Sequence, residues 1–340
     1  MSENIENNSS ESAEHWIGFD LGGTKMLAVV YDNNFKQIGR ARKKTKGRDG
    51  MVAGLKRINL VIKEALEDAG IDKTQIKGLG IGCPGPLDLK KRRIRTAPNL
   101  GWDDVPVAES IEKEFGFPVA IANDVDAGVF GEYKFGAGKD ARCAFGIFPG
   151  TGIGGGCVYE GKLFRGANCT CMEIGHIPLM ANGPLDGAGN AGSLEALASR
   201  LAIASDAAGA AYRGQAPHLL KNAGTDLAEI RSGALAASVA NGDKAVQEII
   251  EQACGHLALS VVTVVHLLAP DVIIFGGGLI EAMPDVMLPK IEKLARKRVL
   301  PSLRDIFKIK AAVLGDDAGV MGAAALARQM VEEMADKSSS

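Results

Sequence analysis

Short apolar runs alternate with longer amphipathic stretches along most of the chain. The runs have the length and composition of buried strands, and the stretches between them repeat apolar positions at helical spacing. This alternation is typical of α/β architecture. The predicted strands are 16–19, 26–31, 76–81, 119–122, 143–148, 157–159, 272–275 and 309–312. The predicted helices are 51–69, 107–115, 125–133, 194–208, 244–268, 287–299 and 319–334.

Two segments of the chain resemble each other. Residues 18–32 and 145–161 each run from an apolar strand through a Gly-Thr turn into a second strand, with Gly23-Thr24 aligned on Gly150-Thr151. Such a repeat predicts a duplicated α/β fold with a cleft between its halves. We expect a disordered tail over 1–15, a first domain of 16–122 plus 316–335, and a larger second domain of 123–315. The polar end 336–340 is also expected to be frayed.

Composition and charge narrow the classes of function. The 340 residues are 46% hydrophobic and 24% charged, as in a soluble globular protein, and the net charge is −2. This balance, with 5% aromatic residues, disfavours a nucleic-acid partner. The six cysteines are scattered and no secretory signal precedes them, which indicates a cytoplasmic location. The most apolar run, 257–269, is too short to span a bilayer, so no membrane partner is expected.

The segment Asp20-Leu-Gly-Gly-Thr-Lys25 is the first candidate for phosphate binding. Its glycines let backbone N–H groups approach phosphate oxygens, the Thr24 hydroxyl and Lys25 ammonium add donors, and Asp20 can hold Mg²⁺ through water. The segment differs from a P-loop because it ends in Gly-Thr-Lys and leads into a strand. An ordinary tight hairpin is the alternative interpretation.

Two further glycine runs fit a nucleotide. The run 150–156 contains Thr151 and Gly152, and a strand ends in Gly276, Gly277 and Gly278 before a helix-like segment. The runs 150–156 and 80–85 both match the dinucleotide pattern GxGxxG, but neither opens a helix, so that hypothesis fails. One bound nucleotide explains the glycine runs better than unrelated turns do.

Three groups of polar residues are candidates for catalysis, ligand binding or metal binding. Asn123-Asp124 ends a strand before a helix, where a carboxylate can accept a proton from a hydroxyl group; plain helix capping is the alternative. Glu173 and His176 lie three residues apart and carry little weight alone. Cys169, Cys171 and His176 suggest a metal site, but inert core cysteines are the favoured interpretation.

Taken in series, these motifs resemble the ROK family of sugar kinases, within the actin/hexokinase/Hsp70 superfamily. The resemblance covers about residues 16–334 and includes, in order, DLGGTK (20–25), GCPGPLD (82–88), APNLGW (97–102), Asn123-Asp124, 150–156, EIGH (173–176), SLE (193–195) and 276–278. It implies a duplicated ribonuclease-H-like (actin-like ATPase) fold and an ATP-dependent hexose kinase, with glucose the leading substrate. It also suggests a homodimer.

The resemblance implies a role for each matching residue. Asp124 would be the general base that deprotonates the attacking sugar hydroxyl. The sugar would be held by Gly85, Asn99, Asn123, Asp124, Glu173, His176 and Glu195. The Mg²⁺ and the phosphates of ATP would face Asp20, Gly22, Gly23, Thr24, Lys25, Thr151 and Gly152, and the adenosine would lie beside Gly277 and Gly278.

One stretch departs from the family pattern. Many members carry a zinc motif, C-x-C-G-x-x-G-C-x-E, and the matching residues 186–195 have Asp186, Ala188 and Ser193 in place of its three cysteines. Zinc needs about four N or S donors, and Ala188 supplies none. We therefore expect no structural zinc, and a loop ordered by other hydrogen bonds.

Alternatives remain open at this point. The sugar can be N-acyl-mannosamine, mannose, fructose or allose, and polyphosphate can replace ATP as donor. The family also contains repressors, so a non-catalytic sugar-binding regulator is the alternative from another class. Repressors carry an N-terminal DNA-binding domain, and the polar start of about fifteen residues is too short for one.

Overall fold

The computed structural model describes residues 14–167 and 171–339, and these fall into two compact units. Unit 1 comprises the chain up to Gly128 and from Gly319 onward, and unit 2 comprises Val129–Ala318. Asn123 and Asp124 thus lie in unit 1, although the sequence suggested a boundary just before them. Of the predicted tail, residues 1–13 lie outside the described residues, and His15 is buried in the first strand.

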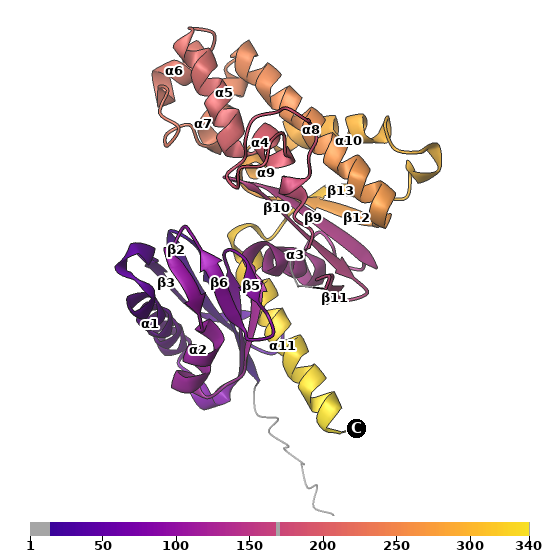
Figure 1. The fold of residues 1–340 in the computed structure, drawn as a ribbon. Coiled ribbons are helices and arrows are strands. Elements are labelled where there is room, and N and C mark those ends of the chain that lie inside the picture. Colours follow the sequence, from indigo (N-terminus) through magenta and orange to yellow (C-terminus); the bar gives the residue numbers. More distant parts are fainter. Residues whose placement is uncertain (1–13, 168–170, 340) are drawn as a thin grey trace, which may run out of the picture. The chain divides into compact units, whose positions relative to one another are not determined.

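Unit 1 is built on a mixed five-stranded sheet in the order β3-β2-β1-β4-β8. Figure 1 labels β2 and β3 of this sheet and the helices α1, α2 and α11. Antiparallel pairs join β1 to β2 and β2 to β3, and parallel pairs join β1 to β4 and β4 to β8. The strands are β1 (His15–Leu21), β2 (Lys25–Tyr31), β3 (Gln37–Lys44), β4 (Ile76–Cys83) and β8 (Val119–Asn123). A second, three-stranded sheet contains β5 (Leu87–Asp88), β6 (Arg93–Ala97) and β7 (Trp102–Val105). The helices are α1 (Met51–Ala69), α2 (Val107–Phe115) and α11 (Ala318–Ser338), with short 3-10 turns at Gly47–Asp49 and Lys73–Gln75.

Helix α11 packs directly on this sheet through two glycines. A Cβ added to Gly18 would lie 1.8 Å from the carbonyl oxygen of Val320, and one added to Gly80 would lie 1.7 Å from that of Ala323. No side chain fits at either position. These glycines therefore allow the last helix of the chain to join the first two parallel strands in one core.

Unit 2 repeats the architecture of unit 1. Its five-stranded sheet has the order β11-β10-β9-β12-β13, again with an antiparallel hairpin followed by parallel strands. The strands are β9 (Cys143–Pro149), β10 (Ile153–Tyr159), β11 (Lys162–Leu163), β12 (Val272–Phe275) and β13 (Lys308–Ala311). The helices are α4 (Leu194–Ala198), α5 (Arg200–Tyr212), α6 (Pro217–Ala223), α7 (Ser232–Ala240), α8 (Lys244–Leu268), α9 (Gly278–Ala282) and α10 (Pro284–Arg296). Helix α3 (Asp124–Phe135) spans the unit boundary, and 3-10 turns occur at Ile174–His176, Pro301–Leu303 and Gly315–Asp317. The predicted duplicated α/β fold is confirmed.

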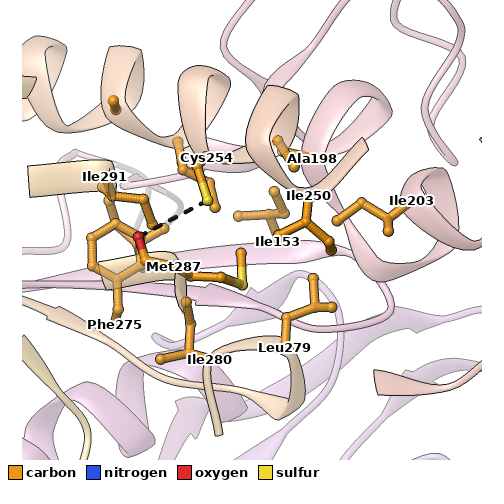
Figure 2. Packing of buried hydrophobic residues seen from close by; sticks show 14 of the residues in the cluster. Ile153, Ala198, Ile203, Ile250, Cys254, Phe275, Leu279, Ile280, Met287 and Ile291 are labelled. Atoms are coloured by element: carbon orange, nitrogen blue, oxygen red, sulfur yellow. Dashed lines mark hydrogen bonds between the residues drawn. The ribbon is translucent and has the colours of Figure 1, made fainter. Parts of the chain in front are cut away.

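The core of unit 2 lies between its sheet and helices α8 and α10 (Figure 2). Cys254 of α8 faces Met287 and Ile291 of α10 and Phe275 of β12, all buried. Among the described residues, α8 is the one helix long and apolar enough to cross a membrane, and half of its most apolar window is buried. Because its buried residues belong to this cluster, α8 serves as a core helix of unit 2.

Most predicted elements are present, and the differences lie in extra elements, one divided helix and shifted element ends. The structure has β3, β5–β7, β11, α6, α7 and α9 beyond those predicted. The predicted helix 194–208 is two helices, because the Ser199 side chain accepts a hydrogen bond from the Ala202 N–H and caps a new helix. Helix α11 runs to Ser338, through residues expected to be frayed, and β10 begins at Ile153 rather than at Cys157.

Candidate functional site

In unit 1, the predicted carboxylates lie where the parallel strands end. Asp20 of β1 pairs with Gly82 of β4, and Cys83 pairs with Asn123 at the end of β8, directly before Asp124. Cys83 is buried, and burial followed by the charges of Asp124 and Asp20 raises the pKa of its thiol well above the usual value. The charges of both carboxylates therefore affect the Cys83 thiol at the buried end of β4. The carboxyl ends of such strands are where α/β sheets bind ligands.

The start of helix α3 also shows the capping considered as an alternative. The Val125 N–H lies 2.9 Å from Asn123 Oδ1 and 2.9 Å from Asp124 Oδ1, and donates to both. These bonds hold the two side chains at the end of β8. Capping and ligand binding are compatible, because each side chain has further polar atoms beyond the oxygen that caps the helix.

The turn between β1 and β2 is held by Thr45, which directly follows β3. The Gly22 N–H donates to the Lys25 carbonyl at 3.0 Å, which closes the turn. Thr45, fully buried, donates through Oγ1 to the Gly22 carbonyl at 2.6 Å, and its own N–H donates to the Thr24 carbonyl at 2.8 Å. The predicted phosphate-binding turn is thus held from behind by Thr45.

The predicted sugar-binding loop of unit 1 borders this turn. A Cβ added to Gly23 would lie 3.7 Å from the Cβ of exposed Asn99. Gly85 has a φ of +77°, and a Cβ there would lie 2.3 Å from the Thr96 carbonyl oxygen, so a side chain is excluded. The structure therefore brings Asn99 next to the Gly22–Lys25 turn and places Gly85 against the strand that leads to Asn99.

In unit 2, the corresponding turn between β9 and β10 is held by two side chains. Glu195 of α4 accepts a hydrogen bond through Oε2 from the Ile153 N–H at 2.9 Å, and a Cβ on Gly152 would lie 2.2 Å from that oxygen. Arg200 donates through Nη2 to Thr151 Oγ1 at 3.0 Å. Glu195 is therefore next to the predicted phosphate-binding residues Thr151 and Gly152.

The third glycine run lies beside the same hairpin. Gly277 has a φ of +81°, and a Cβ there would lie 2.9 Å from the Pro149 carbonyl oxygen at the end of β9. Gly278 begins α9, and a Cβ there would lie 3.1 Å from Ser232 Oγ. Thus β12 and β9, which are parallel neighbours, both end at glycine-rich turns on one edge of the sheet.

His176 is the last residue of the 3-10 turn Ile174–His176, which begins after exposed Glu173. Its Nδ1 lies 2.8 Å from Asp186 Oδ2, and its side chain is 36% exposed whereas that of Asp186 is fully covered. Burial alone lowers the pKa of His176, but the hydrogen bond to Asp186 and the charges of Glu195, Asp186 and Glu173 outweigh burial and raise it. His176 is therefore biased toward its protonated form.

Zinc does not fit the residues at this position. In the part of the chain that the structure describes, one group of three His, Cys, Asp or Glu side chains can offer ligand atoms to a metal: His176, Asp186 and Glu195, with these atoms within 4.8 Å of one another. Asp186 and Glu195 already accept hydrogen bonds, and no sulfur atom joins the group. Cys169 lies outside the described residues, and the Cys171 thiol contacts the Phe164 carbonyl at 3.0 Å.

Magnesium fits the chemistry of unit 1 better. Asp20 and Asp124 present carboxylate oxygens, the hard ligands that Mg²⁺ prefers, and both act on the Cys83 thiol at one strand end. Asp20 is the residue that would hold the ion through water, and the Asp124 carboxylate lies at the neighbouring strand end.

Four supporting residues were not assigned a role from the sequence. Thr45 and Arg200 hold the two hairpin turns, and Asp186 and Ser193 order the loop before α4. For Asp186 and Ser193 a signal existed, since both stand where the family pattern has cysteine. Thr45 and Arg200 carry no local signal, because their partners are 23 and 49 residues away.

Known proteins resemble this chain over nearly its whole length. The model of the ROK family matches residues 16–330. The glucokinase of Thermotoga maritima is 31% identical over 317 residues, which cover 93% of this chain and 98% of that protein. A putative xylose repressor from Caldicellulosiruptor sp. is 27% identical, over 91% of this chain and 77% of that protein.

A solved structure also resembles this chain, in its fold as well as in its sequence. A ROK family glucokinase from Streptomyces griseus, crystallised with glucose and AMPPNP, superimposes with a TM-score of 0.79 and is 30% identical, covering 93% of this chain and 99% of that one. The duplicated sheets, the ordered series of motifs and these matches all indicate the same family. The chain belongs to the ROK family.

Proposed function

We propose that this protein is an ATP-dependent hexose kinase with glucose as its leading substrate, forming glucose 6-phosphate. The observation that carries the proposal is that Asp20 and the pair Asn123-Asp124 lie at the carboxyl ends of β1 and β8, on either side of β4, at the edge where α/β sheets bind ligands. Similarity to glucokinases at about 30% identity supports the class of reaction. Phosphoryl transfer needs a base and charge neutralisation, which these two carboxylates can divide between them.

Asp124 is the proposed general base. Val125 N–H and the end of β8 hold its carboxylate in place, so it can accept the proton of the attacking hydroxyl as the bond to phosphorus forms. Asn99, Asn123, Glu173, His176 and Glu195 are proposed to bind the other sugar hydroxyls, with the Gly85 turn lining the sugar. A hydroxyl left without its partner would cost binding energy, which gives selectivity among hexoses.

The two hairpin turns are the proposed phosphate-binding elements. In unit 1, the Gly22 N–H closes the turn, and Gly23, Thr24 and Lys25 offer a backbone N–H group, a hydroxyl and an ammonium to phosphate oxygens. In unit 2, Thr151 and Gly152 form the matching turn, and Gly277 and Gly278 are proposed to contact the adenosine. When bound, Mg²⁺ held by Asp20 would neutralise charge on the phosphates.

ADP release from Mg-ATP by the purified protein tests this proposal directly. The panel of sugars is glucose, mannose, fructose, allose and N-acetylmannosamine. We expect glucose to stimulate release most, and Asp124→Asn to lower kcat by about 10²–10⁴-fold with nearly unchanged unfolding temperature. Asp103→Asn removes an equal charge from an exposed position of unit 1 and should leave kcat unchanged. Equal activity of Asp124→Asn and Asp103→Asn would refute the role of Asp124.

A sugar-binding regulator is the second candidate, because a putative xylose repressor is also similar to this chain. Calorimetric binding of a sugar without ADP release, with either ATP or polyphosphate as donor, would favour the regulator. Release that requires polyphosphate would change the proposed donor but not the class of enzyme. We also propose a cytoplasmic homodimer, which sedimentation of the purified protein and fractionation of the source cells would test.

A further inference from the structure

The loop before α4 is organised around one buried carboxylate. Asp186 Oδ1 accepts hydrogen bonds from the Ala188 N–H at 2.9 Å and from the Asn190 N–H at 2.8 Å. Oδ2 lies 2.8 Å from His176 Nδ1, 2.8 Å from Ser193 Oγ and 3.3 Å from Asn190 Nδ2. The side chain has no exposed surface, although the backbone around it is exposed. Both oxygens are fully used by donors from within this loop and from His176.

The backbone of the loop needs no metal to close. Gly189 has a φ of +87°, and Gly192 has a φ of +64° and would place a Cβ 1.8 Å from the Met180 carbonyl oxygen. The Gly192 N–H donates to the Pro184 carbonyl at 2.7 Å, and the Leu194 N–H donates to the Ile177 carbonyl at 3.0 Å. The chain thus turns back on itself at these glycines. The Asp186 side chain lies at the centre of the loop and is hydrogen-bonded to it.

Asp186 also connects His176 to the helix that carries Glu195. Ser193 is fully buried, donates its hydroxyl proton to Asp186 and accepts a hydrogen bond from the Ala196 N–H at 3.3 Å, which caps α4. One carboxylate therefore links His176 to the start of the helix that carries Glu195, and both of these residues are proposed to bind sugar.

We propose that Asp186 is a positioning residue that takes the place of a structural metal in this chain, holding His176 through Nδ1 and tying the loop to the N-terminus of α4. The inference about sugar binding rests on the proposed function, whereas the ordering of the loop does not. With Nδ1–H donated to Asp186, Nε2 is the ring nitrogen left to meet a ligand, and in the protonated ring it is a hydrogen-bond donor.

The charges around the pair favour this arrangement. Asp186, Glu195 and Glu173 are the acidic groups that act on His176, and together they outweigh burial in raising its pKa. Burial alone raises the pKa of Asp186, but the hydrogen bonds from His176, Asn190 and Ser193 hold it well below its usual range. A proton shared by the pair therefore resides on the imidazole.

The first test measures metal in the unmodified protein. Elemental analysis of protein purified without chelators should find far less than one zinc per chain, and EDTA should leave the unfolding temperature unchanged. A structural zinc site would give about one zinc per chain and a loss of folding stability on chelation. That result would overturn the proposal whether or not the protein phosphorylates sugar.

The second test measures the tautomer and the pKa of the His176 imidazole. Nitrogen-15 spectra of histidine-labelled protein, without sugar or nucleotide, should show His176 with its proton on Nδ1 when neutral, and His176→Gln assigns the signal. Asp186→Asn replaces the acceptor by an amide that can donate to Nδ1, so the neutral ring should move its proton to Nε2 and its pKa should fall. An unchanged tautomer and pKa would overturn the proposal.

A matched variant separates this role from general effects on a loop. Asp226 caps a surface turn through the Ala228 N–H at 2.9 Å and is exposed. We expect Asp186→Asn to lower the unfolding temperature by roughly 5 °C and Asp226→Asn to change it little. If a sugar is phosphorylated, Asp186→Asn should raise KM for the sugar by at least about tenfold and change KM for ATP little. Equal unfolding temperatures of the two variants would refute the ordering role.

Discussion

Glu195 and Ile153 are joined by a hydrogen bond across 42 residues of sequence, with the Ile153 N–H 2.9 Å from Glu195 Oε2. The bond couples a residue proposed to bind sugar to a turn proposed to bind phosphate. A substitution that moves the Glu195 carboxylate should therefore change sugar affinity even when the substituted residue has no contact with sugar.

Gly152→Ala tests this coupling. The new Cβ would lie 2.2 Å from Glu195 Oε2, the far end of a flexible side chain, so the carboxylate should move while the backbone stays. We expect KM for the sugar to rise several-fold, with a stability loss of about 1–3 kcal/mol. Steady-state kinetics and urea unfolding measure the two effects.

Gly255→Ala is the matched control. Gly255 lies inside helix α8 with nothing within 4 Å of an added Cβ, so alanine should stabilise the protein by about 0.5–1 kcal/mol without changing KM. A Gly152→Ala protein with the same KM as this control would show that Glu195 does not depend on the turn.

Thr45→Val tests the support of the first hairpin turn. Valine keeps the shape of the buried side chain but removes the donor to the Gly22 carbonyl at 2.6 Å, which leaves that oxygen without this bond. We expect a loss of about 1–3 kcal/mol in the free energy of unfolding and a rise in KM for ATP larger than that for sugar. Thr74→Val, at an exposed cap on the Asp72 side chain, should cost less than about 0.5 kcal/mol. Equal losses in the two variants would argue against a special role of Thr45.

The fold was largely readable from the sequence because its central strands are buried on both faces. Strands such as β1 and β12 are nearly uninterrupted apolar runs, and helix α8 carries a continuous apolar face. Strand β3 was not predicted, because QIGRARKK at the edge of the sheet mixes charged with apolar residues. The break at Ser199 was missed because a serine inside an apolar stretch gives no sign of whether it caps a helix.

The site was readable only where its chemistry is local. The turn at Gly22–Lys25 and the pair Asn123-Asp124 could be recognised from their residue types and from their position after a strand. The hydrogen bond between Glu195 and Ile153 depends on tertiary packing, which no local pattern encodes. Asp186 could be recognised as a replacement for cysteine. Its hydrogen bonds to the rest of the loop depend on the folded chain and could not be predicted from the sequence.

Glu132→Ala should be among the most destabilising single substitutions in unit 2. The side chain is fully buried in α3, and its oxygens accept hydrogen bonds from the N–H groups of Ala137, Val313 and Leu314 at 2.8–2.9 Å. Alanine leaves these donors without the carboxylate, at about 1–3 kcal/mol each, so we expect a loss of at least about 3 kcal/mol.

Glu160→Ala serves as the comparison for Glu132. Glu160 pairs with Arg142 on the surface, and such pairs contribute less than about 1 kcal/mol. Urea unfolding of both variants gives the two losses. Similar values would mean that water or another group satisfies the N–H groups that Glu132 now binds.

The stability contributed by the His176–Asp186 pair should depend on pH with a defined sign. Burial opposes both shifts, but hydrogen bonding and nearby carboxylates raise the folded-state pKa of His176 above 6.5 and lower that of Asp186 below 3.8. A raised histidine pKa contributes stability that is present at low pH and is lost as pH rises through the folded value. A depressed aspartate pKa contributes stability that is present above about pH 4 and is lost as pH falls through the folded value.

The pair should therefore stabilise the fold most between about pH 4 and 6.5. Because Glu195 and Glu173 also raise the pKa of His176, the contribution should persist somewhat above pH 6.5 before it declines. The difference in unfolding free energy between the unmodified protein and Asp186→Asn, measured in urea from pH 4 to 9, should be largest near pH 6 and smaller at pH 9. Asp226→Asn should show no such decline. A difference that grows toward pH 9 would mean that the imidazole is neutral throughout and that Asp186 acts only as a loop cap.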